Sequence, residues 1–150
     1  MAARENIFME NLPGSALKFR NFTGAEQKYN PKGSRTFNIE IDDINFAERL
    51  DKDGWNIKWD TKEHDNGEHY LPTLPVQVKF GDYPPRIMME QAGNKVWLNE
   101  DTVGDLDNME ILEVKAIEIR PYNYDVNGKT GVKAYLSKLR VEVARDMFCD

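Results

Sequence analysis

The dipeptide Asn127-Gly128 constrains the fold of this chain more than any other feature. It tolerates positive φ at both central positions of a type I′ turn, and the residues on either side have strand character. The sequence therefore predicts a two-residue β-hairpin whose pairing register is set by the turn. On one side of this hairpin three residue pairs should face each other: Arg120 with Tyr135, Tyr122 with Lys133, and Tyr124 with Gly131.

This side of the predicted hairpin combines three tyrosines with the cations Arg120 and Lys133. They share a face because side chains alternate along a strand, and the opposite face is mostly apolar and is expected to be core. Aromatic rings interleaved with cations suit single-stranded nucleic acid, since each base offers a π-face and each phosphate a charge. The alternative is a solvated sheet face, because cross-strand aromatic pairs also stabilise sheets by about 0.2–1 kcal/mol.

A second basic region lies in a hairpin predicted near the N-terminus. Residues 17–22 and 35–41 alternate like strands, and residues 23–34 form the loop between them. Leu17 and Phe19 are expected to face one side of the first strand. The other side of that strand, the loop and the start of the second strand supply the second set of candidate nucleic-acid-binding residues, namely Lys18, Arg20, Phe22, Lys28, Tyr29, Lys32 and Arg35.

A single short helix is expected after the second strand. Asp42 or Asp43 can cap its start, Gly54 can end it, and apolar residues recur at helical spacing between them. Further strands are predicted at residues 55–59, 74–80, 86–90 and 95–98, with one helical turn within 99–107.

The last two predicted strands each change phase partway along. Apolar residues shift faces near Ala116 in the first and near Ser137 in the second, so each strand needs a bulge. In the register set by the turn, Ile117 should lie opposite Lys138, so both strands slip at the same level. Long strands that bend in this way coil into small barrels. The predicted fold class is therefore mainly β with one short helix, as an OB-type small barrel with a long curved C-terminal hairpin; the alternative is an open α+β sheet.

Length and composition indicate one domain. The chain has 150 residues, of which 40% are hydrophobic, and this is enough to bury a core. We expect residues 1–150 to form a single OB-like domain, with residues 1–14 and 145–150 as flexible ends. A single cysteine, Cys149, indicates a reducing compartment, and no apolar run approaches the roughly 18 residues that span a bilayer. These features predict a soluble cytoplasmic protein.

Charge is segregated along the chain, although the net charge is −6. Residues 1–39 contain six basic and three acidic residues, residues 40–113 seven and eighteen, and residues 114–150 seven and five. A positive groove on an otherwise acidic body is compatible with this pattern. The alternative is an acidic interaction protein, such as a DNA mimic that inhibits a host factor with its acidic middle.

No catalytic constellation is visible. The phosphate-binding glycine loops, the nucleophile elbow and the zinc-protease motif are absent from the sequence. Residues 64–69 cluster two histidines with two carboxylates, but Asn66-Gly67 is typical of a turn and the spacing matches no standard metal site. We therefore expect no enzymatic activity, no cofactor and no metal.

The three tryptophans are the remaining large aromatic candidates. Trp55 and Trp59 share a face with Ile57, so the core is their expected place. Trp97 lies beside Lys95 in polar surroundings, and one of the three is a candidate stacking platform.

Four segments together resemble a known family. In order they are NFTGAEQKYNPKGSRTF, LDKDGWNIKW, PRIMM and IEIRPYNYDVNGKTGVKAYLSKL. The chain from about Phe19 to Val143 resembles small single-stranded DNA-binding proteins encoded by tailed bacteriophages. The resemblance implies an OB-type fold that binds single-stranded DNA without strong sequence preference, in phage replication or recombination in the cytoplasm of the host bacterium. It also implies replication or recombination proteins and a homo-oligomer as further partners to consider, with a recruiting role for the acidic end 145–150.

Overall fold

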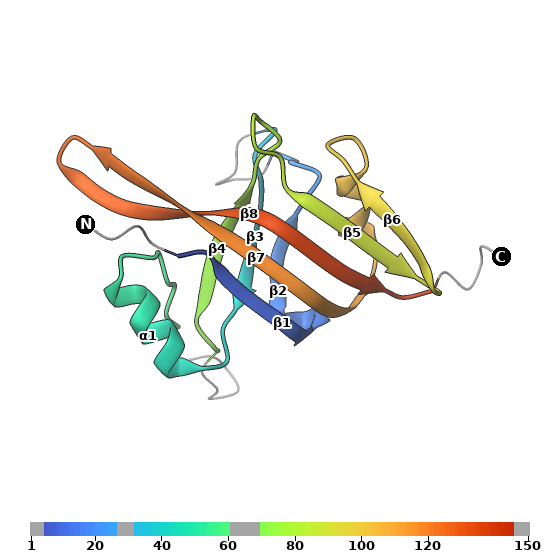
Figure 1. The fold of residues 1–150 in the computed structure, drawn as a ribbon, viewed down its shortest axis with the longest axis horizontal. Coiled ribbons are helices and arrows are strands. Elements are labelled where there is room, and N and C mark those ends of the chain that lie inside the picture. Colours follow the sequence, from blue (N-terminus) through green and yellow to red (C-terminus); the bar gives the residue numbers. More distant parts are fainter. Residues whose placement is uncertain (1–4, 27–31, 61–69, 146–150) are drawn as a thin grey trace.

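The computed structural model describes residues 5–26, 32–60 and 70–145, which form one strand-rich body with a projecting hairpin (Figure 1). In chain order the elements are β1 (Ile7–Pro13), the 3₁₀ turn η1 (Gly14–Ala16), β2 (Leu17–Asn21), β3 (Arg35–Glu40), the helix α1 (Ile44–Lys52), β4 (Thr73–Val78), β5 (Arg86–Gln91), β6 (Asn94–Leu98), the 3₁₀ segment η2 (Val103–Asn108), β7 (Ile111–Val126) and β8 (Lys129–Val143).

The strands form one eight-stranded mixed sheet. Its main path runs β1-β7-β8-β4-β3-β2, and β5 pairs with β8 and β6 beside that path. Most neighbours are antiparallel, whereas β8 runs parallel to both β4 and β5. The end strands β1 and β2 do not pair with each other in the described part of the chain, so the sheet is not closed. The prediction of a mainly β fold with one short helix is confirmed.

The β7–β8 hairpin has the predicted turn and register. Asn127 and Gly128 have φ of 52° and 79°, as a type I′ turn requires. Arg120 pairs with Tyr135, and the next two predicted pairs follow toward the tip. Figure 1 shows that this tip extends well beyond the rest of the sheet. The turn thus fixes which side chains share the outward face of the projecting arm.

Both predicted strand irregularities are present, but they lie at different levels of the hairpin, so the prediction that both strands slip at the same level is wrong. The pairing register shifts on β7 between Val114 and Ala116, and again between Glu118 and Ile119, where Ser137 is the extra residue on β8. The predicted partner of Ile117 was wrong: Ile117 lies opposite Leu139 instead of Lys138, because the extra residue moves the pairing by one position.

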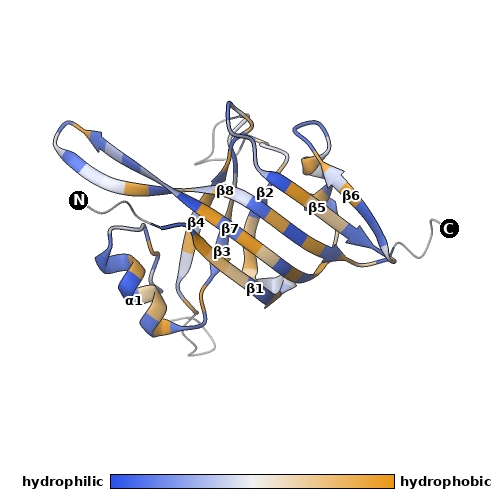
Figure 2. Cartoon of the chain, in the orientation of Figure 1, coloured by the Kyte–Doolittle hydropathy of each residue, from blue (hydrophilic) through white to orange (hydrophobic). Residues whose placement is uncertain are grey.

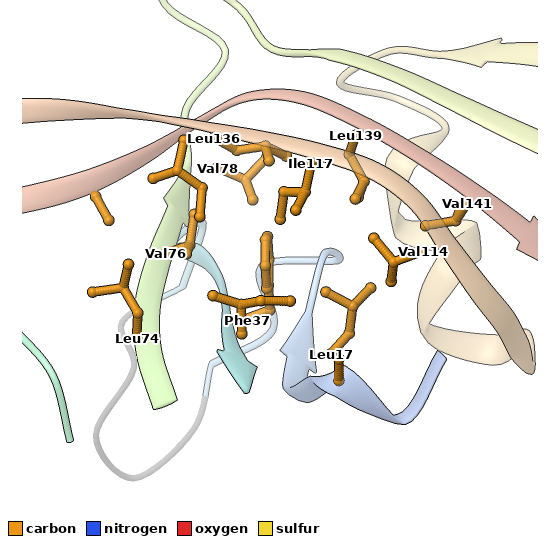
Figure 3. Close-up of a cluster of buried hydrophobic side chains, with 14 of the residues drawn as sticks. Leu17, Phe37, Leu74, Val76, Val78, Val114, Ile117, Leu136, Leu139 and Val141 are labelled. Carbon is orange, nitrogen blue, oxygen red and sulfur yellow. The ribbon is translucent and has the colours of Figure 1, made fainter. Parts of the chain in front are cut away.

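These bulges keep apolar side chains directed into one core. Before and after the shift, β8 buries Leu136 and then Leu139, and β7 buries Ile117 and Val114. Figure 2 shows the resulting alternation of apolar and polar residues along the strands. In Figure 3 these side chains meet Phe37 of β3 in a shared interior. Full burial of one such side chain contributes about 1.5–3 kcal/mol to stability. Burial of these side chains therefore favours the bent course of both long strands.

The N-terminal segment differs from the prediction. Residues 1–14 were expected to be a flexible end, but Ile7–Pro13 form β1, which pairs antiparallel with β7. Ile7 lies opposite Ile119 and is buried. This expectation is therefore wrong for the residues of β1, whose partner strand lies more than a hundred positions away in the sequence.

The faces of β2 also differ from the prediction. Phe19 adopts a φ of 51°, and the pairing with β3 is irregular between Lys18 and Asn21. From Phe19 onward the inward and outward positions of the strand are exchanged, so Phe19 is 79% exposed and Phe22 is fully buried. The prediction that Phe22 shares an exposed face with Lys18 and Arg20 is wrong, because a positive φ within a strand turns the following side chains over.

The helix is the one predicted, and the segment after it is not a strand. Asp43 caps α1 by accepting a hydrogen bond from the backbone N–H of Phe46 at 3.2 Å. Residues 55–59 make only two isolated bridges, from Trp55 to Val132 and from Lys58 to Thr73. The predicted strand pair around Gly93 and the helical turn are present as β5–β6 and η2.

No helix among the described residues is long and apolar enough to cross a bilayer.

Candidate nucleic-acid interface

The outward side of the β7–β8 arm carries the first predicted site. We call this set the tyrosine face; its residues are Arg120, Tyr122, Tyr124, Lys133 and Tyr135. The strand pairing brings all of them together, because no register shift falls between Ile119 and the turn. Their exposure differs, and this difference gives them different roles.

Tyr135 lies at the base of the tyrosine face, opposite Arg120, and is only 7% exposed. The Tyr122 ring stacks on it, with centroids 5.2 Å apart and planes 24° from parallel. The Arg120 Cζ atom and the Lys79 Nζ atom each lie 5.1 Å from the Tyr135 ring centroid, within the range of a cation–π contact. Tyr135 therefore organises two cations and supports Tyr122, whose 49% exposure leaves its outer surface open.

Tyr124 is positioned by a glycine on the opposite strand. A Cβ atom placed on Gly131 would lie 2.4 Å from the Tyr124 hydroxyl oxygen and 2.6 Å from Cζ, so the ring occupies space that only glycine leaves free. The Lys133 Nζ atom lies 5.8 Å from the centroid of the same ring. The sequence predicted this pairing of tyrosine and glycine but not the close approach of the ring.

Two residues of the site were missed in the sequence. Lys79 follows β4 and contacts the Tyr135 ring. Tyr83 lies in the loop before β5, and its ring centroid is 5.8 Å from the Arg120 Cζ atom. Tyr83 is 76% exposed. Lys79 continues the polar alternation of β4, which was a usable signal, whereas Tyr83 lies in a segment without periodicity.

The second predicted set is only partly available to a ligand. The Arg20 guanidinium donates to the carbonyl oxygens of Leu106 and Met109 at 2.9 and 3.0 Å, which ties β2 to the end of η2. Lys18 pairs with Glu40 at 3.6 Å. Phe22 is buried, as described above. Lys32 is exposed, whereas the predicted residues Lys28 and Tyr29 lie outside the described residues.

Arg35 does lie next to the tyrosine face, across a groove of about 320 Å³. We call it the basic groove; it is lined by Gly33, Ser34, Arg35, Gln77, Val78, Lys79 and Phe80. Gln77 pairs with Tyr135 across the parallel β4–β8 contact, and Lys79 lines the groove and also contacts the Tyr135 ring of the tyrosine face. The basic groove therefore joins the two predicted sets.

The Arg35 side chain has unused hydrogen-bonding capacity. Its guanidinium lies over the Phe80 ring at 5.6 Å, and its pairing with Glu100 is long, at 3.8 Å. Its Nε atom is buried and has no hydrogen-bond partner among the described residues. A buried donor without a partner is costly to the stability of the fold.

An ion-pair network lies on the outer side of β5, β7 and β8. The Glu90 carboxylate is 6% exposed, accepts hydrogen bonds from the Arg140 guanidinium, and lies 2.6 Å from the Lys115 ammonium. The Lys115 and Arg140 hydrogen bonds lower the pKa of Glu90 from 4.5 to about 2, against the opposing effect of burial. Glu90 in turn raises the pKa of Lys115.

The described residues contain no group of three or more histidines, cysteines or carboxylates that could hold a metal ion. The histidine cluster at 64–69 lies outside the described residues. What the described surface offers is aromatic rings, cations and grooves.

Residues 2–149 match the family described as "Putative phage ssDNA-binding domain". The chain belongs to this phage single-stranded DNA-binding family. The resemblance predicted from the four sequence segments is thereby confirmed, over a longer stretch than those segments cover. No curated protein matches the chain. Single-stranded DNA, the ligand that defines the family, is the polymer for which rings and cations on one surface are suited.

Proposed function

We propose that this family member binds single-stranded DNA without strong sequence preference, by stacking bases on the tyrosine face and holding phosphates with the neighbouring cations. The observation that carries the proposal is the stacked Tyr122–Tyr135 pair, which leaves Tyr122 half exposed while Arg120 and Lys79 lie against the ring beneath it. Stacking on a ring tolerates any base, because every base has a π-face. This chemistry fits phage replication or recombination in the cytoplasm of the host bacterium.

The path of the bound strand follows from the arrangement of cations. It runs through the basic groove beside Lys79 and onto Tyr122, with Tyr124 and Lys133 beside it on the arm. Arg35 lines that groove, and its guanidinium suits a phosphate there because guanidinium groups pair well with phosphate oxygens. Lys32 at the exposed end of the β2–β3 loop continues the path.

We also infer that the sheet is an OB-type barrel, partly open. The support is topological: β2, β3 and β4 form a meander, β4 runs parallel to β8, β8 pairs with β7, and β7 pairs with β1. Since β1 continues through the three-residue η1 into β2, the two form one bent first strand that borders both edges. The helix α1 then falls between the second and third barrel strands, earlier than the usual position between the third and fourth.

This assignment agrees with the proposed path. OB folds bind oligonucleotides on the face of their second and third strands, between the loops that join strands one to two and four to five. In this chain those elements are β3 and β4, the loop after β2, and the tip of the β7–β8 arm. The basic groove is bordered by the end of the first of these loops, at Gly33 and Ser34, and by β4 with the two residues that follow it.

A titration with single-stranded and duplex oligonucleotides at several salt concentrations tests the proposal. We expect preference for single strands and a linear fall of log affinity with log salt, with a slope near −0.7 per phosphate contacted. Binding that ignores salt would refute the phosphate contacts. A protein that ignores DNA but binds a basic protein partner would instead be an acidic mimic, the alternative that the net charge of −6 left open.

A further inference from the structure

A second groove lies on the outer side of the sheet, away from the basic groove. It has a volume of about 300 Å³, and we call it the aromatic groove. Its lining residues are Phe8, Arg86, Met88, Trp97, Ala116, Ile117, Glu118, Lys138, Leu139 and Arg140. Phe8 is 59% exposed and Trp97 is 63% exposed, so two large rings of one groove are open to solvent.

Strand pairing explains how the aromatic groove is built. In one cross-strand row Phe8 on β1 faces Glu118 on β7, which faces Lys138 on β8. In the next row Ala116 on β7 is followed by Arg140, Met88 and Trp97 on successive strands. The small Ala116 side chain leaves a depression in the middle of the sheet surface, and the aromatic residues on the outer strands β1 and β6 form the two sides of the groove.

The aromatic groove continues the surface of the tyrosine face. On β7 the outward positions run without interruption from Tyr122 through Arg120 to Glu118, because β7 has no extra residue between Ala116 and Tyr122. On β8 the extra residue Ser137 makes Lys138 the next outward position after Tyr135. At about 3.3 Å per residue, only some 10 Å of strand separate Tyr135 from Lys138.

Cations outnumber acids in the lining of the aromatic groove. Arg86, Lys138 and Arg140 line the groove with a single carboxylate, Glu118. Lys138 pairs with Glu118 at 3.8 Å, and Arg140 is hydrogen-bonded to Glu90 of the ion-pair network, so Arg86 supplies the excess positive charge. Arg86 is exposed and has no ion-pair partner among the described residues. On a chain with a net charge of −6, a surface with exposed rings and an excess of cations is a local exception. A basic protein partner would be repelled there, whereas a polyanion with apolar bases fits.

We propose that the aromatic groove is a second subsite for single-stranded DNA, in which a strand that passes from the basic groove onto the tyrosine face continues along β8 and stacks bases on Trp97 and Phe8. Arg86 and Lys138 lie close to the phosphates of this segment. The inference rests on the proposed function, because it extends the same bound strand. The footprint of the protein is therefore longer than the path from the arm through the basic groove.

The test compares two oligothymidines, one of about 6 nucleotides, near the lower end of the roughly 4–16 nucleotides that one OB fold covers, and one of about 20, beyond the upper end. Trp97→Ala should lower the affinity for the long oligonucleotide by about fivefold or more and leave the short one unchanged. Tyr70→Ala is the matched control, since Tyr70 is 58% exposed and lines neither groove. A thermal melt of each variant checks folding, which the high exposure of both rings should preserve.

Trp97 fluorescence gives a second readout in the unaltered protein. Trp55 is 3% exposed, and Trp59, which is 36% exposed, lines neither groove, so quenching by bound bases should arise at Trp97 and be lost in Trp97→Phe. We expect quenching by the long oligonucleotide and not by the short one.

The outcomes separate the two proposals. If neither oligonucleotide binds, the proposed function itself fails. If both bind the parent and Trp97→Ala matches Tyr70→Ala on the long one, only the second subsite is overturned. Equal losses on both lengths also overturn it, because the groove would then not be an extension. A change in oligomeric mass of Trp97→Ala with unchanged DNA affinity would assign the groove to a second copy of the chain and overturn it as well.

Discussion

Tyr122→Ala separates DNA binding from folding more cleanly than any other substitution on the tyrosine face. The Tyr122 ring is half exposed and rests on Tyr135, so its removal takes away a stacking surface without opening the core. Stacking of one base on an aromatic side chain is worth about 1–3 kcal/mol, which corresponds to a loss of affinity of roughly 5- to 150-fold. The variant should therefore bind oligothymidine much more weakly at every salt concentration.

The expected cost to folding is smaller. An aromatic pair contributes about 0.5–1.5 kcal/mol beyond its buried area, and each kcal/mol shifts Tm by about 2–4 °C in a domain of this size. Loss of the aromatic pair alone should thus lower Tm of Tyr122→Ala by no more than about 6 °C, and the lost burial of the half-exposed ring adds to this. Tyr135→Ala should instead lower both affinity and Tm, because that ring is buried and carries the contacts of Arg120 and Lys79.

Fluorescence anisotropy with a labelled oligothymidine, measured at several salt concentrations, gives both affinity and salt slope. The slope should be unchanged in Tyr122→Ala and reduced in Lys133→Ala, since only the lysine can neutralise a phosphate. Tyr70→Ala serves as the control for loss of an exposed tyrosine elsewhere. If Tyr122→Ala folds and binds like Tyr70→Ala, the tyrosine face is only a solvated sheet surface and the stacking argument is refuted.

Three further predictions concern the arm and the ion-pair network. Gly131→Ala should weaken DNA binding severalfold with little change in Tm, because its Cβ atom would displace the Tyr124 ring; parental affinity would exclude that ring from the site. Gly128→Val should lose affinity more than stability, since valine at a φ of 79° costs about 1–3 kcal/mol at a tip with no other atom within 4 Å; a variant that binds normally would show that the turn does not set the site. The pKa of Glu90 is lowered to about 2, so its stabilising effect is complete above pH 4.5 and is lost as the pH falls toward 2. Glu90→Gln should therefore have a lower free energy of unfolding than the parent at pH 7, and the two should differ less at pH 2. An equal difference between them in urea unfolding at both pH values would contradict this.

Local chemistry was enough to predict the arm. Asn127-Gly128 set the register, and the change in apolar phase near Ala116 and Ser137 revealed the bulges, because a buried face penalises any slip of one residue. The predicted cap at Asp43 is another such case, since a helix start depends on its nearest neighbours.

The wrong predictions concern features that are set by contacts between distant parts of the chain. The strand β1 is fixed by pairing with β7, and Arg20 is occupied by carbonyl groups of η2, neither of which leaves a local signal. A positive φ at Phe19 exchanged the expected places of Phe19 and Phe22, and no residue preference of phenylalanine predicts that conformation. Periodicity identified which residues alternate, but not where the alternation is interrupted.

Tyr83 illustrates the same limit at the site. It joins the tyrosine face only because the loop before β5 passes beside Arg120 on β7. Such a contact depends on the parallel placement of β4 and β5 against β8, which is a property of the whole sheet.

Photochemical crosslinking tests the central claim most directly. An oligonucleotide that carries photoreactive thymidine analogues is bound to the unaltered protein, irradiated, and the crosslinked peptides are identified by mass spectrometry. The account predicts crosslinks at the exposed rings Tyr122 and Tyr83, with Lys79 between the tyrosine face and the basic groove. Crosslinks confined to Phe19 and Tyr70, with none on the tyrosine face, would contradict it.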